Sequence, residues 1–123
     1  MIEIRMGDIT AEEVDAIVIP INNDLILGSD VTSAVRRVGG ESIQQELNKL
    51  APIQLGTIAV TGGGALKCKH IIHAAVTPLG LWTNAKWVRS AVHAAIKKIC
   101  EMKLQSVAFA SIGCGAGYFP PHR

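Results

Sequence analysis

The chain has 123 residues, which is enough for one domain and too few for two. Apolar residues make up 49% of it and charged residues 18%, so the chain can bury a core, which excludes an intrinsically disordered protein. Twelve basic and ten acidic residues give a formal net charge of +2 without any block of like charge. This balance gives no strong signal for a nucleic-acid or membrane partner held by bulk electrostatics.

The sequence shows neither a membrane-spanning run nor a secretion signal. No apolar run reaches the roughly 18 residues that a transmembrane helix needs. Residues 1–10 alternate apolar and charged side chains, unlike the basic start and apolar core of a signal peptide. Cys68, Cys100 and Cys114 form an odd and widely spaced set, which favours a reducing compartment over a disulfide framework. We therefore expect a cytoplasmic protein.

Strand and helix patterns alternate along the chain without an internal repeat or a linker. Strands are expected where apolar residues alternate with charged ones or form β-branched runs, and helices where they recur every three or four residues. These patterns predict strands at residues 2–6 and 15–21, helices at 31–38 and 42–50, strands at 57–61 and 70–76, a long helix at 83–102 and a strand at 106–110. The alternation predicts an α/β fold, with a mostly parallel sheet covered by helices on both faces.

Two polar segments follow the first two predicted strands, at the sheet edge where open α/β sheets bind ligands. In the first, the Asp8 carboxylate can accept a hydrogen bond from an amine such as that of adenine, and the Ile9 backbone N–H can donate to a ring nitrogen. In the second, the Asn22 amide can donate and accept, which matches a sugar hydroxyl. Turn formation is the alternative for both, because Asp8 can cap the following turn and Asn22-Asn23-Asp24 is a strong turn signal.

Two loops of small residues complete this edge. Leu27-Gly28-Ser29-Asp30-Val31 opens a predicted helix, whose first N–H groups and positive dipole end favour a phosphate. Residues 111–118 (SIGCGAGY) contain three glycines, so their backbone N–H groups can curl around an anion. The pattern is neither a P-loop nor a dinucleotide fingerprint, because no Gly-Lys-Ser/Thr follows and the glycines do not follow the first strand. Two such loops predict a diphosphate held from both sides.

The sequence predicts no metal and no cofactor. His70 and His73 lie three residues apart in a strand, so they point to opposite faces and cannot share a metal ion. No zinc-type spacing of Cys and His occurs. Cys114 could be a thiolate nucleophile activated by backbone N–H groups, but a small side chain tolerated beside a ligand is the favoured interpretation. His93 is interpreted as a surface or packing residue and not as a catalytic one.

Taken in order, these segments resemble the macro domain, a module that binds ADP-ribose. The resemblance covers nearly the whole chain and rests on an ordered set of segments: Gly7-Asp8-Ile9-Thr10, Val14-Asp15-Ala16-Ile17-Val18, Asn22, Leu27-Gly28, Gly39-Gly40, residues 56–63, Ile71-Ile72-His73 and residues 109–120. It implies a three-layer α/β/α fold around a mixed sheet, with an ADP-ribose cleft along the strand ends.

The resemblance also implies roles for individual residues. Asp8 and the Ile9 backbone would bind adenine, and Asn22 would contact the distal ribose. The diphosphate would lie between two loops, one formed by Gly28, Ser29, Asp30 and Val31 and the other by Ser111, Ile112, Gly113, Cys114, Gly115, Ala116, Gly117 and Tyr118. The implied partner is ADP-ribose or an ADP-ribosylated macromolecule.

Three departures from the family pattern bear on activity. Members that hydrolyse ADP-ribose esters usually carry Asn-Ala-Ala-Asn where this chain has Ile19-Pro20-Ile21-Asn22. Active members often carry an acid where Thr32 stands, and a threonine cannot ionise to act as a general base. Asp30 replaces a usual glycine, and we expect it to cap the helix and repel the phosphate. The prediction is a weakened binding module. The alternatives are a hydrolase that removes ADP-ribose from proteins or nucleic acids or acts on an ADP-ribose derivative, and a non-binding structural remnant that oligomerises.

Family members usually continue for some tens of residues beyond the second glycine loop, whereas this sequence ends at Arg123. The last strand and helix of the fold are therefore expected to be missing, which would leave an unpaired strand edge. A homo-oligomer in which a second copy covers that region is the corresponding expectation.

Overall fold

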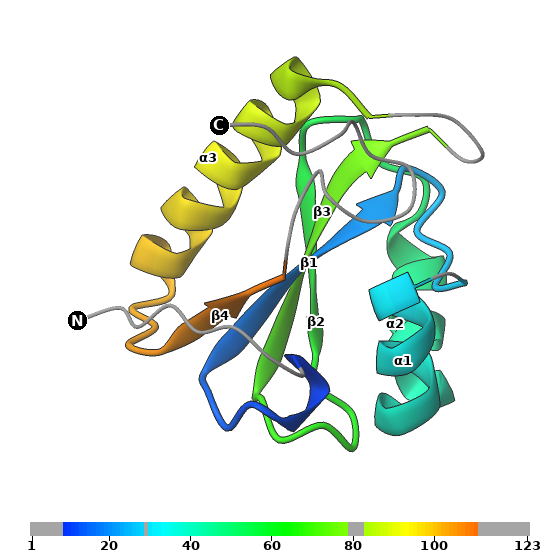
Figure 1. Cartoon of the computed structure of the whole chain (residues 1–123), viewed down its shortest axis with the longest axis vertical. Coiled ribbons are helices and arrows are strands. Elements are labelled where there is room, and N and C mark those ends of the chain that lie inside the picture. The colour runs from blue at the N-terminus through cyan, green and yellow to red at the C-terminus, as the bar shows by residue number, and fades with distance from the viewer. Residues whose placement is uncertain (1–8, 29, 79–82, 111–123) are drawn as a thin grey trace.

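The computed structural model describes residues 9–28, 30–78 and 83–110 (Figure 1). Within them it contains η1 (Ile9–Ala11), β1 (Ala16–Asn22), α1 (Asp30–Gly39), α2 (Glu41–Leu50), β2 (Ile58–Gly62), β3 (His70–Thr77), α3 (Ala85–Glu101) and β4 (Val107–Phe109). Every element that the sequence predicts in this part of the chain is present, with bounds within two residues of the prediction. The strand expected at residues 2–6 and the glycine loop at residues 111–118 lie outside the described residues.

The four described strands form one mixed sheet in the order β2-β3-β1-β4. β1 pairs in parallel with both β3 and β4, so that Ile17 lies opposite Ile71 on one side and Ala108 on the other. β2 instead pairs with β3 in the antiparallel sense. The sheet is therefore mixed, as the family resemblance implies, and the mostly parallel arrangement holds for β1, β3 and β4. Because these three strands run the same way, they end at one common edge.

Helices cover both faces of the sheet, so the fold has three layers (Figure 1). α1 and α2 lie on one face and α3 lies on the other. β1 is apolar on both faces, which explains its continuous run of aliphatic residues. Ile17 and Ile19 pack on the α1/α2 side, whereas Ala16 and Val18 pack on the α3 side. The predicted α/β/α architecture is confirmed.

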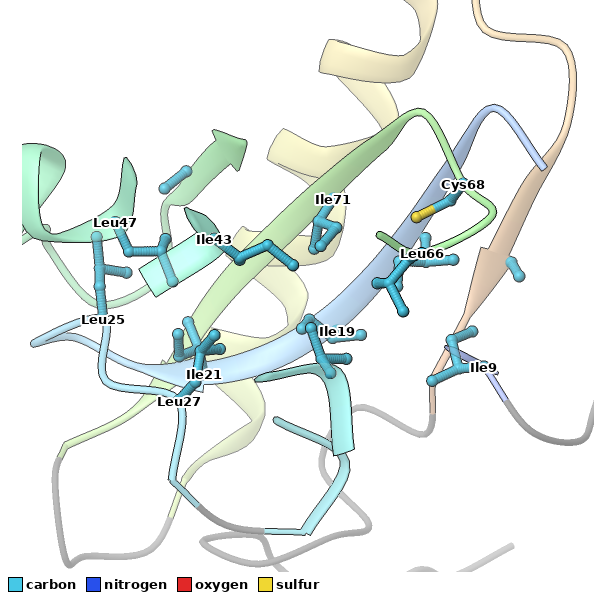
Figure 2. Packing of buried hydrophobic residues seen from close by; sticks show 14 of the residues in the cluster. Ile9, Ile19, Ile21, Leu25, Leu27, Ile43, Leu47, Leu66, Cys68 and Ile71 are labelled. Atoms are coloured by element: carbon cyan, nitrogen blue, oxygen red, sulfur yellow. The ribbon is translucent and has the colours of Figure 1, made fainter. Parts of the chain in front are cut away.

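The α1/α2 side is filled mainly by large aliphatic side chains. Figure 2 shows Ile19, Ile21 and Ile71 of the sheet in one cluster with Ile43 and Leu47 of α2. Because these five residues are almost fully inaccessible to water, their burial is a main source of stability on this side.

The α3 side is filled by smaller residues. Ala91, Ala95 and Ile99 recur at helical spacing and pack against Ile72 and the rest of that face. Trp87, four residues before Ala91 on the same helix, is only half-buried. Small residues let α3 lie close to the sheet. No helix among the described residues is long and apolar enough to cross a membrane.

The predicted break between the first two helices is a glycine turn. α1 ends at Gly39, and Gly40 adopts a φ of 92°, a conformation that glycine tolerates better than other residues. The Gly40 N–H donates to the Arg36 carbonyl, and α2 starts at the next residue. The turn lets two short helices share one face of the sheet.

Candidate ligand-binding site

The carboxyl ends of β1, β3 and β4 meet at one edge of the sheet, and the loop from β1 to α1 runs along it. This loop spans residues 23–28 and is held in place by backbone bonds. The Asn23 N–H donates to the Thr77 carbonyl at the end of β3 (3.2 Å), and the Asn23 carbonyl accepts from the Ile53 N–H (3.0 Å). The loop is thus fixed to the neighbouring strand and to the segment after α2.

Asn22, predicted as a ribose contact or a turn residue, closes a turn in this structure. Its side-chain nitrogen donates to the Ile26 carbonyl (2.8 Å), and its side-chain oxygen accepts from the Ile26 N–H (3.1 Å). Leu25, inside the turn, has a φ of 59°, a left-handed conformation that is uncommon outside glycine. The turn alternative therefore describes this structure. A contact of Asn22 with a ribose stays a prediction. It would use the remaining hydrogen-bonding capacity of the side-chain amide or replace one of the two bonds to Ile26.

Gln44 of α2 makes hydrogen bonds to the backbone of the same loop. This role was not predicted from the sequence. Its side chain is 6% exposed. Its oxygen accepts from the Leu27 N–H (2.9 Å), and its nitrogen donates to the Leu25 carbonyl (2.9 Å) and to Asn48 (2.8 Å). A buried amide that satisfies two loop groups fixes the loop backbone, because leaving such groups unpaired is costly. The only signal in the sequence is a glutamine on the apolar face of a helix, next to Ile43.

Two residues of α1 hold the end of the loop. The Thr32 hydroxyl, on a residue that is 6% exposed, accepts from the Gly28 N–H (3.2 Å). Arg36 donates to the Leu27 carbonyl (3.1 Å) and makes a bidentate ion pair with the Glu41 carboxylate (2.7 and 2.9 Å). Hydrogen bonding to Arg36 lowers the pKa of the Glu41 carboxyl below its usual value. Thr32 and Arg36 therefore position the loop that leads into α1.

The loop leads into the first turn of α1. This helix begins at Asp30, so Ser29 stands at the position before the helix and Asp30 is the first helical residue. The first turn of a helix carries N–H groups without intrahelical partners and a partial positive charge. An anion at the strand ends can accept hydrogen bonds from these N–H groups and is attracted by the partial positive charge. The capping role predicted for Asp30 stays a prediction.

Ile9 lies in η1, ahead of β1, and its side chain is buried in the α1/α2 cluster (Figure 2). Its side chain is thus a packing group, which leaves its backbone for the predicted adenine contact. The predicted site residues Asp8, Ser29, Ser111, Ile112, Gly113, Cys114, Gly115, Ala116, Gly117 and Tyr118 lie outside the described residues. The structure therefore brings together Asn22, Gly28 and the start of α1, and the second phosphate loop stays a prediction.

A depression of about 520 Å³ lies next to the same loop. Its described lining residues come from the loop, from α1 and from the start of α2: Leu27, Gly28, Ser33, Arg36, Arg37, Gly40 and Glu41. Because Leu27 and Gly28 belong to the β1–α1 loop, the depression adjoins the candidate site.

His73 is a buried structural group. It is 0% exposed, and its Nε2 lies 2.9 Å from the Thr61 hydroxyl on the neighbouring strand. Burial lowers the pKa of His73 to about 3, so the ring is neutral near pH 7. Its Nδ1 has no hydrogen-bond partner in the described structure. No group of three or more His, Cys, Asp or Glu residues in the described ranges is placed to hold a metal ion.

The comparison with protein families identifies the class to which this fold belongs. The family model described as Macro domain matches residues 18–123. This chain belongs to the macro domain family.

Curated relatives and solved structures agree with this assignment. An uncharacterized protein of Mycobacterium tuberculosis is 34% identical over 97% of this chain, which covers 33% of that protein. An uncharacterized protein of Saccharolobus solfataricus is 38% identical over 93% of this chain and 66% of its own length. The Oceanobacillus iheyensis macrodomain solved with ADP is 27% identical, with a TM-score of 0.82 over 97% of this chain and 67% of that one. The chain thus spans only about a third of the mycobacterial relative.

Proposed function

We propose that this chain is a binding module for ADP-ribose or a related ADP-ribosyl nucleotide. The observation that carries the proposal is the fixed loop at residues 23–28, which leads from the end of β1 to the first turn of α1. A loop that is already ordered costs less conformational entropy when it binds a ligand.

The proposal assigns one part of the ligand to each part of this edge. The diphosphate lies against the N-terminus of α1 and Gly28, where N–H groups and the helix dipole favour an anion. The distal ribose lies near Asn22, and adenine lies near Asp8 and the Ile9 backbone. The second diphosphate contact that the family resemblance implies, residues 111–118, lies outside the described residues.

The family provides independent support for this ligand class. The Oceanobacillus iheyensis macrodomain, 27% identical, has been solved with ADP, which contains the adenosine and diphosphate of ADP-ribose. A glycine-to-valine variant of the same protein has been solved with ADPR, and its 24% identity to this chain supports the shared fold. The ADP part of the ligand is therefore the better supported part of the proposal.

Binding is favoured over hydrolysis by the environment of Thr32. Its hydroxyl is buried and accepts a hydrogen bond from the Gly28 N–H. A threonine hydroxyl in this position supports the loop and is not a base that could activate a water molecule. ADP-ribosyl hydrolase activity is thus the weaker candidate.

Thermal melting tests the proposal. ADP-ribose at about 100 times its dissociation constant should stabilise the folded state by about 2.7 kcal/mol. ADP should also stabilise the protein, whereas adenosine, which lacks the diphosphate, should do so far less. The Asp30→Gly variant should bind ADP-ribose more tightly, because it removes a negative charge from the phosphate site. An unchanged melting temperature with millimolar ADP-ribose would contradict the proposed function.

A further inference from the structure

The basic residues of the chain are concentrated on α3. This helix carries Lys86, Arg89, Lys97 and Lys98 against the single acid Glu101, a formal charge of +3. The whole chain has twelve basic and ten acidic residues, so the rest of it has eight basic and nine acidic residues and a charge of −1. The net charge of +2 is therefore the sum of a basic helix and a slightly acidic remainder. For this reason the net charge alone gives no strong signal for a polyanionic partner.

Three of these cations lie on one face of the helix. Lys86, Arg89 and Lys97 are all exposed, and with the exposed His93 between them they follow spacings of three, four and four residues. Such spacings place side chains along one stripe, about 5–6 Å apart. The stripe lies opposite the buried Ala91 and the other residues that pack on the sheet. We call Lys86, Arg89, His93 and Lys97 the α3 stripe.

The cations of the α3 stripe are not neutralised within the described part of the chain. The one ion pair of α3 there joins Lys98 to Glu101 at 3.3 Å and lies beside the stripe. Lys86, Arg89 and Lys97 make no ion pair with any residue that the structure describes. Elsewhere Lys67 lies near Glu13, and Lys69 lies near Asp15. The α3 stripe thus brings together three cations that have no ion-pair partner among the described residues.

We propose that the α3 stripe binds the phosphate backbone of double-stranded nucleic acid. From Lys86 to Lys97 the stripe extends about 16 Å along the helix, and a duplex presents roughly one negative charge per 1.7 Å of its axis. This charge density favours a duplex over an acidic polypeptide. The stripe carries no Phe, Tyr or Trp side chain on which unpaired bases could stack, which favours a duplex over a single strand. Contacts to phosphates alone are independent of base sequence.

The α3 stripe is separate from the candidate ADP-ribose site, because α3 covers the face opposite to α1 and α2 (Figure 1). The start of α3 nevertheless lies at the strand-end edge, where the Thr83 hydroxyl donates to the Val76 carbonyl near the end of β3. A duplex on the stripe would approach this edge without occupying the β1–α1 loop. Nucleic-acid binding therefore does not depend on ADP-ribose binding.

Fluorescence anisotropy with a short labelled DNA duplex tests this proposal. The wild-type chain should bind with a dissociation constant below about 100 µM at physiological salt, the weak end of non-specific binding. Neutralising three phosphates gives a slope of about −2.7 for log K against log salt, or roughly 40-fold weaker binding at 200 mM than at 50 mM salt. Base sequence should have little effect.

Two triple variants separate the stripe from overall charge. Lys86→Glu/Arg89→Glu/Lys97→Glu reverses the charge of the stripe, whereas Arg37→Glu/Lys49→Glu/Lys67→Glu makes the same change in net charge at exposed positions outside α3. The first should lose at least ten times more affinity than the second, with circular dichroism showing both folded. If the first does not fold, Lys86→Gln/Arg89→Gln/Lys97→Gln takes its place with the same expectation.

Three results would overturn the proposal. Equal losses in the two triple variants would show a general charge effect without a stripe. An unchanged anisotropy at 50 mM salt would show that no duplex binds. Displacement of the duplex by polyglutamate at equal charge concentration would show that the partner is an acidic polypeptide.

Discussion

The two faces of the sheet are packed by different kinds of residue. On the α1/α2 side, large aliphatic residues surround buried polar groups, namely Thr32, Gln44, Thr61 and His73. On the α3 side, the buried cluster is entirely apolar and rich in alanine and valine, with Thr83 at its edge. The first side holds the loop of the candidate site, and the second presents a basic surface to solvent.

This difference distinguishes the two proposed binding surfaces. The buried amide of Gln44 fixes the loop backbone through specific hydrogen bonds, which an apolar core could not do. The α3 side has only apolar residues in its buried cluster, and its outer surface carries the exposed cations of the α3 stripe. Changes on the two sides should therefore affect stability alike and ligand binding differently.

The largest effects on stability are expected from matched truncations on the two sides. Ile21→Ala and Ile72→Ala should each destabilise the fold by about 2–5 kcal/mol, because both side chains are buried and each change leaves a cavity. Only Ile21→Ala should also weaken ADP-ribose binding, since Ile21 belongs to the same buried cluster as Leu25 and Leu27 of the loop (Figure 2). Urea denaturation and calorimetric titration measure the two effects. Equal loss of affinity in both variants would contradict the division between the sides.

The buried histidine should make stability depend on pH. The pKa of His73 is about 3 in the folded state and 6.5 ordinarily, so the unfolded chain binds a proton that the folded chain does not. Stability should therefore fall as the pH drops from about 6.5 towards 3, by about 2 kcal/mol between pH 6.5 and 5. Denaturation across this pH range should show the falling free energy of unfolding in the wild type. In His73→Leu the contribution of the histidine to this fall should be absent. The same slope in both proteins would contradict this account.

Removing the amide that supports the loop should have an intermediate effect. Gln44→Leu leaves the Leu27 N–H and the Leu25 carbonyl without their partner and should cost about 1–3 kcal/mol. It should also weaken ADP-ribose binding, because the loop is no longer held in one conformation. Gln45→Leu, on the exposed side of α2, is the matched control and should change neither quantity. Unaltered affinity in Gln44→Leu would show that the loop is not part of the site.

The smallest effect is expected at the start of α3. The side chain of Asn84 accepts from the Trp87 N–H (2.9 Å) and caps the helix. Asn84→Ala should cost about 1 kcal/mol, and Asn84→Ser, which keeps an acceptor, should recover most of it. Affinity for ADP-ribose should be unchanged in both variants. Thermal melting with and without ADP-ribose checks the two expectations, and a weaker ligand effect in Asn84→Ala would link α3 to the site.

Most of the fold could be predicted from local patterns. The apolar run at residues 15–21, the break between the helices at 31–38 and 42–50, and the long helix at 83–102 each follow from local patterns, and the structure confirms all three. The antiparallel direction of β2 was not predicted, because alternation along a strand does not fix which way its neighbour runs. The homo-oligomer and the cytoplasmic location stay predictions.

The candidate site was harder to predict than the fold. Asn22, Gly28 and Asp30 follow from their position after a buried strand and before a helix. Gln44 could not be found in this way, because it lies 19 residues from the Leu25 carbonyl that it binds. A hydrogen bond across such a separation has no local sequence signature. The hydroxyl of Thr32 is similar, since only the folded loop brings the Gly28 N–H to it.

The central claim is that ADP-ribose binds at the β1–α1 loop. An NMR titration that follows the backbone amides tests it most directly. The account predicts that ADP-ribose shifts the amide signals of Leu27, Gly28 and Asp30 in a saturable manner, while those of Ala91 and Ala95 in α3 stay in place. Loop signals that do not move at saturating ADP-ribose, or shifts confined to α3, would contradict it.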